Sequence, residues 1–205
     1  MERRAAARIA LGILGLVAVG ARFGEGLAEP DFSAANFLSY FTIESNLIAA
    51  VVLLAAGFAA RAGHAPSERL DLWRGAATLY IATTGIVYSA LLAADADNLL
   101  AWTNIVLHYV MPVAVVADWA LDRPAWRIPF ARALAWAIYP VAFIAYTLVR
   151  GEITGWYPYP FLDVAERGYP AVVVTLAILA AALLAAIWGL AATTGRRRAP
   201  VTATG

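Results

Sequence analysis

Apolar residues gather along the chain into six long runs, separated by shorter polar segments. The runs are Ala5 to Phe23, Phe37 to Ala60, Gly75 to Ala94, Ala101 to Leu121, Arg132 to Val149 and Tyr169 to Thr193. Each approaches the ~20 residues that a helix needs to cross the hydrocarbon core of a membrane. The pattern therefore predicts an all-α polytopic membrane protein, a bundle of six transmembrane helices.

Composition supports this interpretation. Of the 205 residues, 62% are hydrophobic and 14% are charged, whereas a soluble domain is about a quarter charged. The chain has 15 basic residues, all arginine, and 14 acidic residues. We therefore expect no surface basic enough for a nucleic-acid partner. Cysteine is absent and only one of the two histidines lies in an apolar run. We therefore expect no metal and no cofactor.

Arginine is distributed unevenly between the two sides of the predicted bundle. The side that holds both termini carries Arg3, Arg4, Arg8, Arg61, Arg69, Arg74, Arg123, Arg127, Arg132, Arg196, Arg197 and Arg198. The opposite side carries Arg22, Arg150 and Arg167. The positive-inside rule then predicts cytoplasmic termini, in a chain whose alanine- and arginine-rich composition favours a bacterial plasma (inner) membrane. Residues 1–195 form the predicted single domain, and residues 196–205 a basic, disordered tail.

Two of the runs contain polar side chains that are expensive in hydrocarbon, at about 2.5 to 3.5 kcal/mol for a charged residue. Thr42, Ser45 and Asn46 fall at i, i+3 and i+4 in the second run and share one helix face. Asn104 and His108 are likewise i and i+4 in the fourth run. Such residues usually face the interior of a bundle, and we take them as the candidate site.

The fourth run also contains Pro112, four residues beyond His108. Proline has no N–H to offer the carbonyl of the preceding turn, so the helix is expected to kink there. Both runs cross from outside to inside. At 1.5 Å per residue, Thr42 and His108 therefore lie about 8 and 10 Å below the outer boundary. A hydroxyl and an imidazole at these depths are able to meet.

Two interpretations of this pair remain open from the spacing. In the catalytic one, His108 is a general base that activates Thr42 as nucleophile, because a threonine hydroxyl is inert without a neighbour to remove its proton. Asn46 or Asn104 would orient the imidazole or donate to an oxyanion. In the structural one, Thr42 bonds back to its own helix and His108 bonds to Asn104, as interhelical polar contacts.

Glu44 and Arg150 are charged residues outside this pair, and each has both a functional and a structural interpretation. Glu44 lies within the second run, about 200° around the helix from the face of Thr42. A lone intramembrane acid is typical of proton-coupled transport, but pairing with an arginine or a tyrosine hydroxyl would make it structural. Arg150, at the outer end of the fifth run, suits either a substrate carboxylate or headgroup snorkelling.

The connection before the last run contains an aromatic segment, Gly155-Trp156-Tyr157-Pro158-Tyr159-Pro160-Phe161. Tryptophan and tyrosine combine an apolar body with a polar tip, which suits the headgroup level of a membrane. The segment is either a plain interfacial belt or a lid over a cavity.

The motifs together resemble a known family. Tyr40-Phe41-Thr42-Ile43-Glu44-Ser45-Asn46, Leu107-His108-Tyr109-Val110-Met111-Pro112, Asp118-Trp119 and the aromatic segment resemble the prokaryotic six-span branch of the androgen-induced, FAR-17a-like membrane proteins. The likeness covers nearly the whole chain and rests on the order and placement of short motifs. One departure is Glu44, where the family pattern often has glutamine.

The resemblance implies a membrane-embedded threonine hydrolase. Animal members of that family split fatty acid esters of hydroxy fatty acids with a threonine and a histidine, roles that fall by motif on Thr42 and His108. The expected partners are a lipid or fatty-acyl ester substrate and membrane lipids, with Ser45, Asn46, Asn104 and Arg150 in binding or support. The alternatives are a small proton-coupled transporter using Glu44 and a non-catalytic lipid-binding membrane protein.

Overall fold

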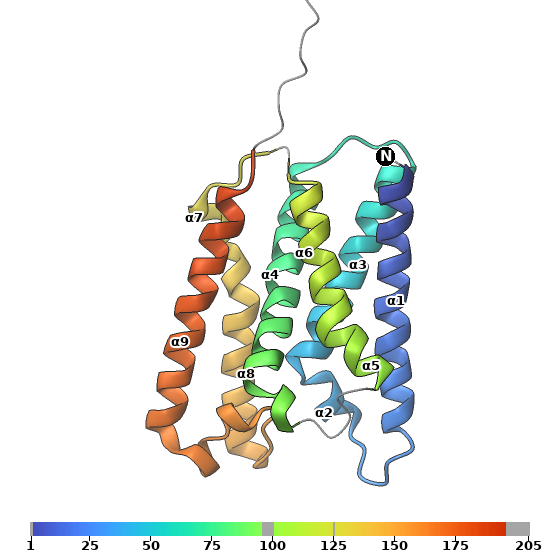
Figure 1. Cartoon of the computed structure of the whole chain (residues 1–205). Coiled ribbons are helices and arrows are strands. Elements are labelled where there is room, and N and C mark those ends of the chain that lie inside the picture. The colour runs from blue at the N-terminus through green and yellow to red at the C-terminus, as the bar shows by residue number, and fades with distance from the viewer. Residues whose placement is uncertain (1, 96–100, 125, 196–205) are drawn as a thin grey trace, which may run out of the picture.

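The computed structural model describes residues 2–95, 101–124 and 126–195, and this part of the chain is helical, without strands. Figure 1 shows long helices lying side by side, with the N-terminus at one end of the bundle. The predicted all-α fold is confirmed. The predicted disordered tail, residues 196–205, lies outside the described residues.

Nine α-helices are described in this part of the chain: α1 (Glu2–Gly26), α2 (Ala34–Leu38), α3 (Phe41–Arg61), α4 (Glu68–Leu91), α5 (Trp102–Ile105), α6 (Met111–Leu121), α7 (Phe130–Ala133), α8 (Ile138–Thr154) and α9 (Val164–Ala192). A π-helical turn, η2 (Val106–Val110), joins α5 to α6, and a 3-10 turn, η3 (Leu134–Ala137), joins α7 to α8. Short 3-10 turns, η1 (Ala93–Asp95) and η4 (Pro160–Leu162), follow α4 and precede α9.

Among the described residues, five continuous helical segments are long and apolar enough to cross a membrane. They are Glu2–Gly26, Phe41–Arg61, Trp102–Leu121, Phe130–Thr154 and Tyr169–Ala192. Each overlaps one of the six predicted runs. By length and composition, the described part of the chain therefore has the character of a membrane protein.

Helix α4 overlaps the remaining predicted run, but it is not among these five segments. It is 24 residues long, and its first two turns carry Glu68, Arg69, Asp71 and Arg74. It packs against α3, α6 and α9 near the centre of the bundle (Figure 1), and many of its residues are buried. A helix enclosed by other helices needs less apolar surface than one facing lipid. The low hydropathy of α4 follows from its central position.

The second predicted run is not one continuous helix. Helix α2 ends at Leu38, α3 begins at Phe41, and Tyr40 between them has the extended backbone angles φ −87° and ψ 126°. The Ser39 N–H donates to the Asn36 carbonyl at 3.0 Å, and the Ser39 hydroxyl donates to the Ala35 carbonyl at 2.6 Å. The expected start of this helix at Phe37 was therefore wrong. Thr42 lies in the first turn of α3.

Charged side chains form a network at the end of the bundle that holds the N-terminus. Arg8 of α1 donates to Asp118 and to Asp122, both at 2.8 Å. Arg74 of α4 donates to Asp71 at 3.0 Å and to Asp118 at 3.1 Å. Burial alone would raise the pKa of the Asp122 carboxyl, but the hydrogen bond and charge of Arg8 bring that pKa below its usual range. The network ties α1, α4 and α6 together.

Candidate functional site

Thr42 and His108 meet between the first turn of α3 and the π-helical turn η2. Thr42 Oγ1 lies 3.3 Å from His108 Nε2, and both side chains are half-buried. The structure thus brings together the two residues that the sequence places at similar depth. This distance is within hydrogen-bond reach of a nucleophile and its base.

The other imidazole nitrogen fixes which tautomer faces Thr42. His108 Nδ1 lies 3.1 Å from the backbone carbonyl oxygen of Asn104. A carbonyl can only accept, so we assign the ring proton to Nδ1. Nε2 then presents a lone pair to the Thr42 hydroxyl, as a general base requires. Asn104 orients the imidazole as the sequence suggested, but through its main chain rather than its side chain.

His108 owes its position to the irregular turn around it. In η2 the Met111 N–H donates to the carbonyl of Val106, five residues earlier, so the turn holds one residue more than an α-helical turn. Pro112 follows directly at the start of α6. The predicted irregularity near Pro112 is thus a π-helical turn on its N-terminal side. Single π-helical turns of this kind are frequent at functional sites.

Tyr88 of α4 holds the imidazole from one side. Its ring stacks on that of His108, with centroids 3.7 Å apart and planes 19° from parallel. The Tyr88 hydroxyl accepts a hydrogen bond from Asn104 Nδ2 at 2.8 Å. Tyr88, Asn104 and His108 therefore form a closed triangle of contacts. Sequence analysis did not identify Tyr88, because an isolated tyrosine on a neighbouring helix carries no spacing signal.

Asn46 and Ser45 support Thr42 from behind. Asn46 Nδ2 donates to the carbonyl of Thr42 at 2.8 Å and to that of Leu107 at 3.1 Å. Ser45 Oγ donates to the Thr42 carbonyl at 3.2 Å and contacts Thr84 Oγ1 at 2.7 Å. The suggestion that Asn46 orients the imidazole or donates to an oxyanion is therefore wrong, because its amide already serves two backbone carbonyls. It joins α3 to η2 instead.

The aromatic segment folds inward over Thr42. Tyr159 is buried, its ring packs edge-on against Tyr40 with centroids 5.7 Å apart, and its hydroxyl accepts from the Thr42 N–H at 3.3 Å. Burial raises the pKa of Tyr159 to about 12, so the hydroxyl keeps its proton at physiological pH. Phe161 is also buried, whereas Trp156 is half-buried. Tyr159 and Phe161 thus pack into the bundle, and the choice between an interfacial belt and a lid stays a prediction.

Glu44 has a partner on another helix. Tyr139 of α8 donates from its hydroxyl to Glu44 Oε2 at 2.6 Å. The Tyr139 ring also stacks on Phe41, with centroids 5.2 Å apart. Of the partners suggested for this acid, the structure shows a tyrosine hydroxyl, and the transport alternative stays a prediction. Glu44 thereby connects α3 to α8, away from His108.

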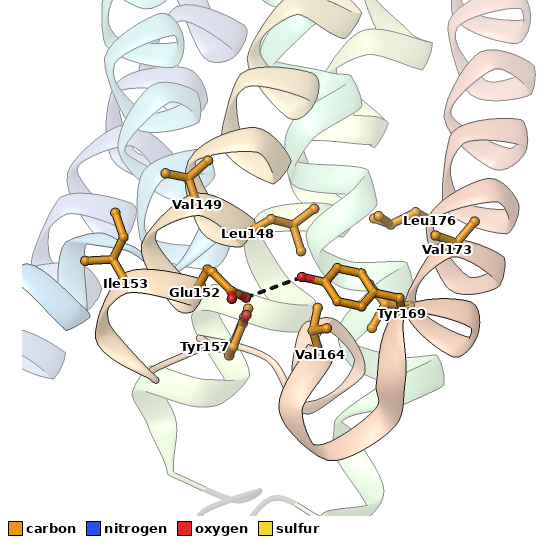
Figure 2. A pocket seen from close by; sticks show the side chains of 10 residues that line it. Leu148, Val149, Glu152, Ile153, Tyr157, Val164, Tyr169, Val173 and Leu176 are labelled. Carbon is orange, nitrogen blue, oxygen red and sulfur yellow. Dashed lines mark hydrogen bonds between the residues drawn. The ribbon is translucent and has the colours of Figure 1, made fainter.

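Two hollows adjoin α8, and Thr42 and His108 line neither. The first is a hollow of about 360 Å³ between α8 and α9, shown in Figure 2, where Tyr169 points its hydroxyl toward Glu152 at 3.4 Å. The second hollow lies along α8 beside Arg150.

Among the described residues, no group of three or more histidine, aspartate and glutamate side chains is arranged to hold a metal ion. Comparisons of the chain with protein-family models, with curated proteins and with solved structures find no match.

Proposed function

We propose that this chain is an intramembrane hydrolase that cleaves lipid esters through an acyl-enzyme on Thr42. The contact between Thr42 Oγ1 and His108 Nε2 at 3.3 Å is the observation that supports it most directly. The tautomer assigned from the Asn104 carbonyl supports it further, because it leaves a basic nitrogen facing the hydroxyl. Fatty acid esters of hydroxy fatty acids, or similar acyl esters, are the substrates that the motif resemblance implies.

The proposed reaction has two acyl-transfer steps. Thr42 Oγ1 attacks the ester carbonyl carbon while its proton passes to His108 Nε2. The tetrahedral intermediate collapses, the bond to the leaving alcohol breaks, and the alcohol oxygen takes the proton from Nε2. Water then attacks the acyl-threonine, again losing a proton to His108. The acid leaves and the Thr42 hydroxyl is restored.

The developing oxyanion would meet a donor beside the start of α3. The first N–H groups of a helix have no intrahelical acceptor and lie at the positive end of its dipole. The Thr42 N–H is one of these, and its present partner is the Tyr159 hydroxyl. A hydroxyl that accepts one hydrogen bond can donate another. We propose that the Tyr159 O–H donates to the oxyanion while the Thr42 N–H holds the Tyr159 oxygen in position.

The proposed topology has six spans, with the central α4 as the sixth and both termini cytoplasmic in a bacterial inner membrane. Its support is the arginine asymmetry, together with the position of α2 and α5 at the end of the bundle opposite the N-terminus (Figure 1). Thr42 and His108 would then lie near the outer face. Because the Tyr159 hydroxyl is bonded to the Thr42 N–H, the proposal includes movement of the aromatic segment when substrate enters.

Labelling with a fluorophosphonate, read by intact-protein mass spectrometry, tests this function. The wild-type protein is expected to gain one adduct, and Thr42→Ala to gain none. Thr83→Ala is the matched control, because Thr83 Oγ1 bonds only to its own helix at the Leu79 carbonyl. It should label like the wild type. A folded wild-type protein that neither forms an adduct nor turns over any lipid ester would contradict the proposal and leave a non-catalytic lipid-binding protein.

Gly85 offers a test of the position of His108 from outside the reacting pair. A Cβ atom at Gly85 would lie 2.8 Å from Pro112 Cβ and 3.3 Å from the His108 carbonyl oxygen. Gly85→Ala is expected to displace η2 and to slow adduct formation by up to about 10²-fold, as misplacement of a catalytic group by about 1 Å does. Gly20→Ala is the control, because nothing lies within 4 Å of that position. Equal labelling rates in the two variants would show that η2 tolerates the added methyl group.

A further inference from the structure

Arg150 has a guanidinium that the described part of the chain satisfies only in part. Its Nη2 donates to Asn36 Oδ1 of α2 at 2.6 Å, and its Cζ lies 4.7 Å from the centroid of the Trp156 ring. Its Nη1 is buried and has no hydrogen-bond partner among the described residues. An unsatisfied charged donor is costly to bury. The side chain is thus held in place with one of its terminal nitrogens lacking an acceptor.

No carboxylate of the described residues forms an ion pair with Arg150. Arg22, at the same end of the bundle, pairs with Glu25 at 3.2 Å. The buried arginines of the opposite end, Arg8 and Arg74, bind two aspartates each. Arg150 instead has an amide oxygen and an aromatic face. These partners fix its orientation without neutralising its charge.

The surface beside this guanidinium is apolar and elongated. Ala145, Tyr146, Val149, Ile153 and Thr154 of α8 line a hollow of about 470 Å³ that also borders Arg150. Val149 and Ile153 are 62% and 79% exposed, in a helix apolar enough to cross a membrane. The hollow therefore offers contact for a hydrocarbon chain with a fixed positive charge beside it.

We propose that Arg150 binds the anionic group, a carboxylate or a phosphate, of a lipid whose acyl chain lies along α8. A guanidinium is planar and presents paired N–H donors that match both oxyanions. The orphaned Nη1 donor is the group that such an anion satisfies. Asn36 and Trp156 hold the guanidinium for it, which lowers the entropy lost on binding.

This anion site is connected to the start of α3. Tyr146, which lines the hollow, has its hydroxyl 2.8 Å from Ser39 Oγ, and Ser39 precedes Thr42 by three residues. Asn36, the partner of Arg150, lies in α2 of the same segment. If the proposed function holds, the lipid bound at Arg150 is substrate, and esters that carry a free acid group are preferred. The binding itself does not depend on turnover.

Retention of radiolabelled palmitate and of hexadecanol, a neutral chain with no ester bond to hydrolyse, on protein in a non-ionic detergent tests the proposal. The two probes share a chain and differ in charge. The wild-type protein is expected to bind palmitate at least about tenfold more tightly, as one charge-assisted pair provides. Thr42→Ala should keep this preference, so failure of the hydrolase proposal leaves the binding result intact. Equal binding of the two probes by the wild-type protein would overturn the proposal without any variant.

Three variants assign the preference to Arg150. Arg150→Gln is expected to abolish it, and Arg150→Lys to retain part of it through the remaining charge. Arg167→Gln, which removes an exposed arginine in the first turn of α9, should leave it unchanged. Preference surviving in Arg150→Gln would overturn the assignment. Displacement of palmitate by dipalmitoyl phosphatidate, but not by dipalmitoyl phosphatidylcholine, would identify a phosphate headgroup as the stronger ligand, and displacement by neither would identify the carboxylate.

Discussion

Replacement of His108 by glutamine is expected to slow hydrolysis of a lipid ester by about 10²–10⁴-fold, the contribution of a positioned general base. Glutamine can still form hydrogen bonds, but it cannot take the proton of the Thr42 hydroxyl. His108 Nε2 lies 3.3 Å from that hydroxyl and acts in the chemical step. The loss should therefore appear in kcat, with substrate binding nearly unchanged. Initial rates over a range of ester concentrations measure both quantities.

The other histidine provides the matched control. His64 lies in the exposed connection between α3 and α4, and His64→Gln should hydrolyse at the wild-type rate. Thr42→Ala should lose as much as His108→Gln, and the double variant little more, since residues that act as one unit are not additive. Retention of the wild-type kcat by a folded His108→Gln protein would remove the general base from the mechanism.

Replacement of Arg74 by methionine is expected to lower the free energy of unfolding by about 3–5 kcal/mol, the cost of leaving a buried ion pair without one partner. Arg74 is buried and donates to Asp71, to Asp118 and, at 2.8 Å, to the carbonyl of Asp122. Asp71 is buried too, and its second oxygen already lacks a partner. Without Arg74 it would be an isolated buried charge.

Unfolding titrations of the detergent-solubilised protein measure this loss. Arg69→Met is the control, because Arg69 lies on the same helix and is exposed. The stability that Asp122 contributes also depends on pH. The pKa of Asp122 is lowered on folding, so its contribution to stability is present above the ordinary aspartate pKa and is lost as the pH falls through the lowered value. An Arg74→Met protein as stable as Arg69→Met would show that the network contributes little.

Hydropathy predicts most of this fold, because five segments must satisfy the same requirement of length and apolarity. Hydropathy does not identify α4 as a span, because a helix packed against other helices needs less apolar surface than one that faces lipid. It also misses the break at Ser39 and Tyr40, because the extended backbone of one residue leaves no trace in a running average of hydrophobicity.

The candidate site was predictable where its residues share a helix face or a depth. Their similar depth predicts that Thr42 and His108 meet. The group that orients His108 could not be predicted, because it is a main-chain carbonyl, which every residue possesses. Tyr88 and Tyr159 act from other elements, 20 and 51 residues from His108 along the chain. Only folding shows that these distant rings cover one imidazole and one hydroxyl.

The π-helical turn η2 separates the helix from Trp102 to Leu121 into two halves that are out of phase by one residue. The half that follows it carries Asp118 to Arg8 and Arg74, whereas His108 lies within the turn itself. Deletion of a single residue between Val106 and Val110 would restore regular winding and rotate one half by about 100° relative to the other. After such a deletion, the helix could keep either the contacts of Asp118 with Arg8 and Arg74 or the position of His108, but not both. The one extra residue lets a single helix serve both.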